Sequence, residues 1–121
     1  MTSPACSVAT RYLQALVRQD WDGVAACLAP GVLRHGPFGD DLEGTAAYLS
    51  FLRRTMPSLP GYVMDIDRVT GLGDERAMVE LRETILVEGA PLVTHECLVF
   101  EVGPEGLLEE IFVYIRQAPR P

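Results

Sequence analysis

Residues 76–102 read RAMVELRETILVEGAPLVTHECLVFEV, two runs of alternating apolar and polar residues joined at Gly89-Ala90. Alternation with a period of two is typical of a β-strand that buries one face, and a short glycine-containing connection between two such runs predicts a β-hairpin. A connection of even length centred on Gly89-Ala90 places Glu83 opposite Glu96. This hairpin decides the fold, because its two faces determine where the rest of the chain can pack.

One face of the predicted hairpin is apolar except for a carboxylate pair. Its apolar members are Val79, Leu81, Ile85, Leu98 and Phe100. The opposite face mixes charged and apolar side chains, among them Glu80, Arg82, His95 and Cys97. We therefore expect helices to cover the first face, and solvent or a partner to meet the second.

Two further strands extend the sheet on either side of the hairpin. They are expected at 62–70 and 107–117, next to turns that contain glycine. Because each connection is short, the four strands are predicted to form a sequential antiparallel sheet. Phe112 and Tyr114 fall on the face away from the helices, so we expect a second copy of the chain to cover it and form a homodimer.

The first half of the chain predicts helices. Ser3-Pro4 is an N-cap followed by proline at the first helical position, and an apolar stripe that includes Tyr12 follows at helical spacing. Asp20 can cap a second, short helix that begins at Trp21. Both helices are expected to bury one side.

A third helix follows a short strand expected at 32–35 and an acidic loop at 40–43 that we expect to be a solvated turn. This helix carries Tyr48 and Leu52 on its apolar side and is expected to end before Pro57. Helices followed by a meander of strands predict an α+β fold with the helices on one face of the sheet.

The length and composition of the chain limit its domain count and the kinds of partner that it can bind. A length of 121 residues is typical of a single domain, 1–121, and no apolar run approaches the roughly 20 residues that cross a bilayer. The chain has 17 acidic residues and 10 basic ones, all arginine, and its net charge of −7 disfavours nucleic acid and anionic membranes as partners. The first residues show neither a basic start nor an apolar signal core, so we expect a cytoplasmic location. The three cysteines are widely spaced, and no metal site is predicted.

Glu83 and Glu96 give the sharpest indication of a functional site. Two carboxylates that face each other across an apolar sheet surface lie about 4.5–5.5 Å apart at Cβ and cannot both ionise easily. We expect the pair to share a proton, which would provide an acid and a base at neutral pH. The alternative is a connection of different length that shifts the register, or solvation of both carboxylates at the open end of the sheet.

Several short segments, taken in order, resemble the nuclear transport factor 2 superfamily. They are Arg11-Tyr12, 20–24 (DWDGV), 33–37 (LRHGP), 44–47 (GTAA) and the closing meander, and they span nearly the whole chain. Within that superfamily the sequence is most similar to SnoaL-type polyketide cyclases, ketosteroid isomerases and limonene-epoxide hydrolases. The resemblance implies a cone-shaped, cystatin-like barrel in which three helices and a strongly curved antiparallel sheet enclose a pocket.

The resemblance to ketosteroid isomerases covers part of their site. Tyr12 matches the tyrosine with which those enzymes donate a hydrogen bond to the substrate oxyanion. Gly36 stands where they carry the general-base aspartate, and Leu98 stands where they carry the second oxyanion donor. The usual form of that isomerisation is therefore not implied.

The resemblance to limonene-epoxide hydrolases is partial too. Glu83 matches their acid, whereas Leu81 and Val113 replace their arginine and second aspartate. His35 matches a pocket position where SnoaL-like proteins often carry histidine. This match implies a polar site without naming its reaction.

These observations predict a small-molecule pocket with acid–base chemistry. Glu83 and Glu96 would share a proton, His35 would shuttle it, and Tyr12 would stabilise developing negative charge. The expected substrate is a small, largely apolar carbonyl or epoxide compound, and isomerisation, cyclisation or hydration would require no cofactor. The alternative is a non-catalytic ligand-binding or dimeric interaction module of the same fold. The pocket walls are expected to come from Trp21, Tyr48, Leu52, Leu81, Leu98, Phe100 and Val113.

Overall fold

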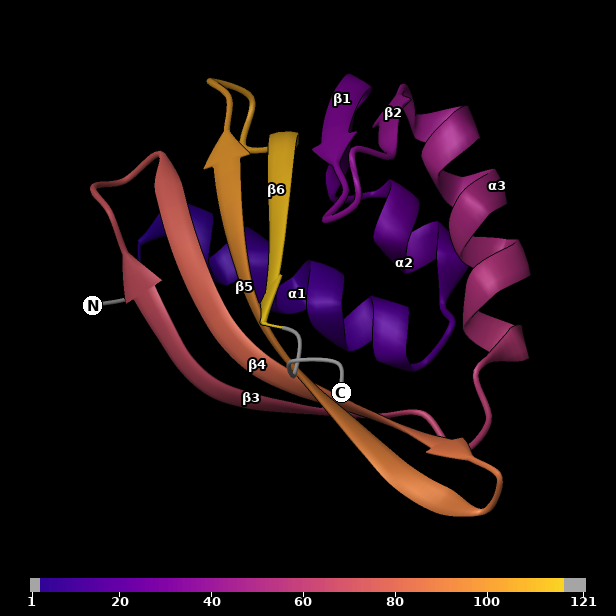
Figure 1. The fold of residues 1–121 in the computed structure, drawn as a ribbon. Helices are drawn as coiled ribbons and strands as arrows, with labels where there is room; N and C mark the ends of the chain where they lie inside the picture. The colour runs from indigo at the N-terminus through magenta and orange to yellow at the C-terminus, as the bar shows by residue number, and fades with distance from the viewer. Residues whose placement is uncertain (1–2, 117–121) are drawn as a thin grey trace.

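A computed structural model describes residues 3–116, which form three α-helices packed on a six-stranded sheet (Figure 1). The helices are α1 (Pro4–Val17), α2 (Trp21–Ala25) and α3 (Thr45–Thr55), which a 3₁₀ turn at Met56–Ser58 extends. The strands are β1 (Leu28–His35), β2 (Asp41–Glu43), β3 (Val63–Gly71), β4 (Arg76–Val87), β5 (Ala90–Val102) and β6 (Leu108–Arg116). The α+β fold class is confirmed.

The sheet is mixed and open. Its strand order is β2-β1-β6-β5-β4-β3, and the meander from β3 to β6 is antiparallel as predicted. The prediction of a fully antiparallel sheet is wrong at one place, because β1 pairs with β6 in parallel. The strands bend strongly around the helices without closing into a full barrel, since no pairing of the described strands joins β2 to β3 (Figure 1).

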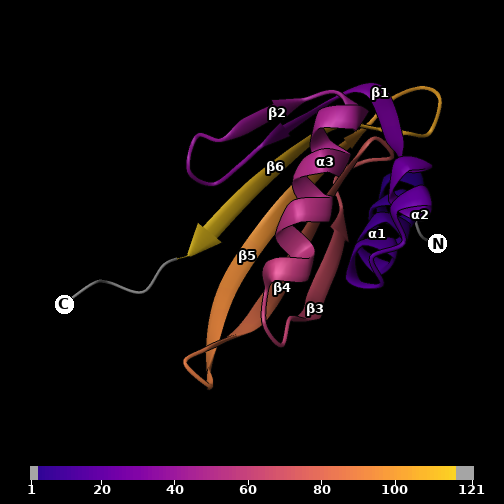
Figure 2. The same ribbon diagram turned by 90° about the vertical axis from the view of Figure 1, so that its right-hand side faces the viewer.

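All three helices lie on the concave side of the sheet (Figure 2). The predicted N-caps of the first two are present: the Ser3 hydroxyl accepts from the Cys6 amide at 3.1 Å, and the Asp20 carboxylate accepts from the Gly23 amide at 3.0 Å. The core lies between α1 and the inner face of the sheet. Its largest fully buried side chains include Tyr12, Leu13, Leu81, Phe100, Leu108 and Ile111.

Strand β1 begins four residues before the predicted strand at 32–35. Its pairing with β6 is irregular between Leu28 and Leu33, the stretch that contains Pro30-Gly31. Proline has no amide hydrogen to donate to a neighbouring strand, which suits this irregular stretch. At the other end of the chain, β6 covers the strand expected at 107–117 as far as Arg116, and Gln117 lies outside the described residues.

The predicted acidic loop at 40–43 is partly a strand. Asp41–Glu43 forms β2, which pairs antiparallel with Leu33–His35 of β1 and covers the free edge of that strand. Asp40 organises the turn before it, because its carboxylate accepts from the Phe38 amide at 3.0 Å and its carbonyl accepts from the Gly36 amide at 3.2 Å.

The register of the central hairpin differs from the prediction by two residues. Val87 pairs with Ala90, so the turn is Glu88-Gly89, whose φ angles of 53° and 80° fit a type I′ turn. Glu83 therefore lies opposite Thr94, not opposite Glu96 as predicted. A shift of two keeps every side chain on its predicted face. The two glutamates are thus diagonal neighbours on the inner face.

None of the helices within residues 3–116 is long and apolar enough to cross a membrane.

Candidate functional site

A cavity of about 160 Å³ lies inside the curved sheet, beneath α1 and α3. Most of its wall is apolar, and the polar side chains that reach it come from five elements: α1, β1, α3, β4 and β5. The polar lining residues are Tyr12, Arg34, Tyr48, Thr55, Glu83 and Glu96. We call this space the inner cavity.

A wider space of about 440 Å³, the vestibule, lies next to the inner cavity. The turn that carries Pro37 and Phe38 lines it, together with the ends of β4 and β5. Leu59, Glu83 and Glu96 line both spaces. The two carboxylates therefore mark the junction between the inner cavity and its approach.

Glu83 is partly buried and has one side-chain partner. The Tyr62 hydroxyl, just before β3, donates a hydrogen bond to its carboxylate. Burial raises the pKa of Glu83, while the hydrogen bond from Tyr62 and the positive charge of Arg34 pull it back. A carboxyl group with a raised pKa is better matched to proton transfer near neutral pH than an exposed glutamate.

Two buried tyrosines meet at the helix side of the inner cavity. The hydroxyls of Tyr12 on α1 and Tyr48 on α3 are hydrogen-bonded to each other. The ring of Phe100 packs edge-on against Tyr12, with ring centroids 5.7 Å apart. Burial raises the pKa of both tyrosines, so both stay protonated. One hydroxyl donates to the other, and the pair keeps one O–H for a further acceptor.

Arg34 on β1 also lines the inner cavity, and sequence reasoning missed it. Its guanidinium carbon lies 4.9 Å from the centroid of the Phe51 ring, and its Nη1 donates to Asp40 at 3.1 Å. Its charge and a hydrogen bond oppose the rise of the Tyr48 pKa. This places a permanent positive charge beside the tyrosine pair.

His35 does not join this site. It is paired with Phe112 across β1 and β6, and its ring stacks on the Phe112 ring at 4.8 Å. Its Nε2 lies 2.6 Å from Glu110, and its Nδ1 lies 3.5 Å from Asp41. Because neighbours along a strand point to opposite faces, Arg34 faces inward and His35 faces outward, so the predicted pocket position of His35 is wrong.

The other predicted pocket residues divide into two groups. Those that line the inner cavity are Tyr12, Tyr48, Leu52, Leu81, Glu83, Glu96, Leu98 and Val113. Phe100 lies behind Tyr12 in the core, and Trp21 packs against the core without lining either space. Most of the predicted residues therefore lie around one space, and their role toward a ligand stays a prediction.

Tyr62 and Arg34 are polar side chains of the candidate site that the sequence did not reveal. The face of Arg34 was ambiguous because Val32 and Leu33 are both apolar, so alternation along β1 fits either orientation. Tyr62 falls at the predicted start of a strand, where nothing marks a partner 21 residues away.

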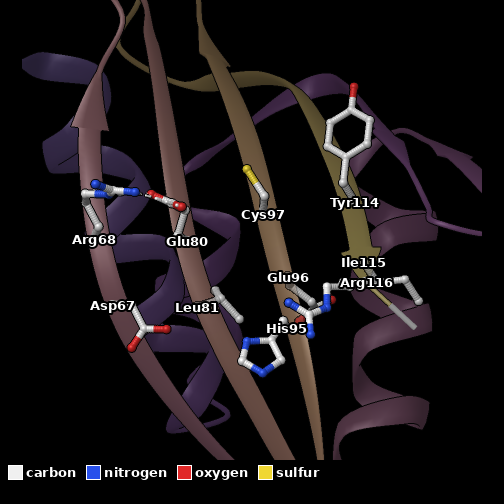
Figure 3. Close-up of a pocket in the computed structure, with 10 residues that line it drawn as sticks. All are labelled: Asp67, Arg68, Glu80, Leu81, His95, Glu96, Cys97, Tyr114, Ile115 and Arg116. Carbon is white, nitrogen blue, oxygen red and sulfur yellow. Dashed lines mark hydrogen bonds and ion pairs between the residues drawn. The ribbon is translucent and has the colours of Figure 1, made fainter. Parts of the chain in front are cut away.

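The outer face of the sheet carries a groove of about 530 Å³ (Figure 3), which shares Glu96, Ile115 and Arg116 with the vestibule. Two ion pairs cross from β3 to β4 on this face, Arg68 with Glu80 and Arg82 with Asp67. His95, Glu96 and Arg116 also line the groove. Tyr114 stands exposed on β6 beside it. Within residues 3–116, no group of three or more His, Cys, Asp or Glu side chains is arranged to hold a metal ion.

Comparison with known families gives a match over most of the chain. The family model described as the SnoaL-like domain matches residues 9–111. No curated protein matches the chain in sequence.

Solved structures share the fold at low sequence identity. A candidate ketosteroid isomerase from Kribbella flavida is 23% identical, with a TM-score of 0.79 over 98% of this chain and 82% of its own. An epoxide hydrolase from Mycobacterium tuberculosis, similar to limonene-epoxide hydrolase, is 24% identical, with a TM-score of 0.78 over 93% of this chain and 83% of its own. A third protein, also from M. tuberculosis and crystallised in complex with estradiol-17β-hemisuccinate, is 15% identical, with a TM-score of 0.77 over 93% and 94%.

Proposed function

Because the chain belongs to the SnoaL-like domain family, within the nuclear transport factor 2-like superfamily, we propose that it binds a small, largely apolar carbonyl or epoxide compound and transfers a proton on it. One observation carries this proposal: the partly buried carboxyl of Glu83 stands where the inner cavity meets its vestibule. Burying a carboxyl group is unfavourable unless hydrogen bonds or opposite charges compensate it, and a carboxyl with a shifted pKa at the mouth of a cavity is a candidate functional group.

The proposed roles follow from where each group stands. Glu83 removes a proton from the carbon next to a carbonyl. In the epoxide reaction, protonated Glu83 donates to the ring oxygen as a water molecule attacks a ring carbon, the ring C–O bond breaks, and the attacking water releases a proton to solvent. Tyr12 and Tyr48 act as a hydrogen-bonded pair: one hydroxyl donates to the other, and the O–H that remains donates to the oxygen that gains negative charge. Glu96 is the second carboxylate at the junction, placed to exchange the proton with Glu83 or with water. The outward-facing His35 takes no part.

Deuterium exchange tests the proton transfer directly. Acetophenone incubated with the protein in D₂O should exchange its methyl protons, followed by ¹H NMR, and styrene oxide should give the diol if the epoxide reaction applies. We expect Glu83→Gln to lower the active reaction by about 10²–10⁴-fold, because the general acid or base is removed. Glu105→Gln, in an exposed turn, is the matched control. Equal rates in the two variants would contradict the proposal.

A binding module without chemistry is the second candidate. The observation that favours it is the apolar character of the wall at Leu81, Leu98 and Val113, which leaves few groups to assist Glu83. This candidate predicts that acetophenone or styrene oxide shifts the NMR signals of residues lining the inner cavity while neither compound is converted.

We also propose that two copies of the chain associate through the outer face of the sheet. Tyr114 is 57% exposed and Val93 47% exposed there, and antiparallel sheets that leave apolar residues uncovered are common interfaces. Light scattering at micromolar concentration should give twice the chain mass of 13.3 kDa. Tyr114→Arg should give the mass of one chain, because it places a charge in the proposed interface. Val17→Arg, on an exposed part of α1, should still give the mass of two chains. A single mass for the unmodified chain would remove this idea.

A further inference from the structure

Arg34 is the most enclosed arginine among the ion pairs of residues 3–116. Its side chain is 13% exposed, compared with 41% for Arg82, 48% for Arg76 and 68% for Arg68. Removing a guanidinium from water is unfavourable unless hydrogen bonds replace the water. Arg34 should therefore be the arginine with the most complete set of partners.

The structure shows the reverse. On the outer face, Arg82 donates to Asp67 through both Nε and Nη2, and Arg68 donates to Glu80 through the same two atoms. Arg34 donates to one carboxylate, that of Asp40, and only through Nη1, which lies 3.1 Å from Asp40 Oδ2. The Asp40 side chain is itself 46% exposed. A guanidinium has five N–H donors and no acceptor. Most donors of Arg34 therefore remain without a carboxylate or carbonyl partner among the described residues.

The position of the guanidinium makes these donors useful to a ligand. Phe51 packs against its face, at 4.9 Å from ring centroid to guanidinium carbon, so the edge that carries the N–H groups is what remains for a ligand. Arg34 lines the inner cavity together with Tyr48, whose hydroxyl adds another donor. A planar fork of N–H groups beside a hydroxyl matches the two oxygens of a carboxylate.

We propose that the molecule bound in the inner cavity carries a carboxylate, held by the N–H groups of Arg34 that Asp40 does not use. This inference rests on the proposed pocket function and adds the chemical class of the ligand, an acid with an apolar body. The carboxylate meets Arg34 on β1, the body lies along Leu98 and Val113, and the rest of the molecule reaches Glu83 at the junction.

Benzoate and its neutral analogue benzamide test the proposal by binding alone. Both are titrated at pH 7 into the ¹⁵N-labelled protein, and dissociation constants are taken from the shifts of inner-cavity residues. We expect benzoate to bind roughly tenfold or more tightly than benzamide, a difference of about 1.4 kcal/mol. Arg34→Gln should abolish this preference. Arg34→Lys should keep only part of it, because lysine retains the charge and loses the fork.

Arg82→Gln is the matched control, since it removes an arginine of the outer face, and it should leave the preference for benzoate unchanged. Thermal melts establish that each variant is folded. Equal affinity for benzoate and benzamide, a preference that survives Arg34→Gln, or no benzoate binding at millimolar concentration would each overturn the proposal.

The two proposals fail differently. Benzoate binding that depends on Arg34, without proton exchange on any ketone, would remove the acid–base chemistry and leave the carboxylate site. Exchange that depends on Glu83, with no preference for benzoate, would do the opposite.

Discussion

The two faces of the sheet both carry charged side chains, but they hold them in different ways. On the outer face, Arg68 and Glu80 pair across β3 and β4 while largely exposed to water. On the inner face, Glu83 and Arg34 are enclosed. Glu83 accepts a hydrogen bond from Tyr62, and Arg34 donates to a carboxylate, that of Asp40, through one nitrogen. Exposed ion pairs contribute little to stability and are screened by salt, whereas enclosed charges with few partners reduce it.

This difference indicates which face serves a ligand. The outer pairs satisfy each other and need nothing further from a small molecule. The inner groups keep unused hydrogen-bonding capacity and border an empty volume of about 160 Å³.

Removing an aromatic ring should have the largest effect and should separate the faces most clearly. Phe100→Ala, at a residue with no exposed surface, should lower the free energy of unfolding by about 3–5 kcal/mol, because it leaves a cavity beneath Tyr12. Tyr114→Ala on the outer face should lower it by less than about 1 kcal/mol in the monomer. Urea denaturation at a concentration too low for dimers measures both. Equal losses would show that the outer face is packed as tightly as the inner one.

Neutralising one glutamate on each face should change stability in opposite directions. The pKa of Glu83 is raised by burial, so its contribution to stability is greatest at low pH and is lost as pH rises from the ordinary value of 4.5 through the raised one. Glu83→Gln should therefore stabilise the protein at pH 7.

The pKa of Glu80 is lowered by its hydrogen bond to Arg68, so its contribution is present above pH 4.5 and is lost as pH falls through the lowered value. Glu80→Gln should slightly destabilise the protein at pH 7. Thermal melts at pH 7 compare the two variants, and a loss of stability in Glu83→Gln would contradict the account.

His35 should give the smallest effect, because it is partly exposed on the outer side. The hydrogen bond to Glu110, aided by Asp41, raises its pKa above the ordinary 6.5. Its contribution to stability is therefore complete below pH 6.5 and is lost as pH rises through the raised pKa. Melting temperatures from pH 6 to 9 should fall more steeply for the unmodified chain than for His35→Gln. Identical pH profiles would remove the proposed pairing with Glu110; His95→Gln serves as the control.

The sequence predicted faces better than registers. Alternation in β4 and β5 placed Leu81, Leu98 and both glutamates correctly on the inner face. Successive side chains of a strand alternate between the two faces, so a register error of two residues leaves each side chain on the same face. The register failed because Glu88, a residue that rarely adopts positive φ, occupies the first position of the tight turn. Sequence preferences favoured a turn that begins at the glycine.

Contacts between distant segments were not predictable from local patterns. The parallel pairing of β1 with β6 joins segments about 80 residues apart in sequence, and no short-range signal specifies it. That pairing also determines which of Arg34 and His35 faces the inner cavity. It places His35 beside Phe112 on the outer side, so the side chain of Arg34 lines the cavity. The sequence therefore placed most of the cavity wall and both glutamates on the inner face, and it placed His35 on the wrong face. That these residues bind or act on a ligand stays a prediction.

The most direct test of the account is the ionisation of Glu83 in the free protein. In a ¹³C NMR titration of the glutamate side-chain carboxyls, assigned with the Glu83→Gln and Glu80→Gln variants, Glu83 should titrate above the ordinary glutamate pKa and Glu80 below it. If Glu83 instead titrates together with the exposed glutamates, its carboxyl is hydrated like theirs, and the inner face holds no enclosed acid for a ligand to use.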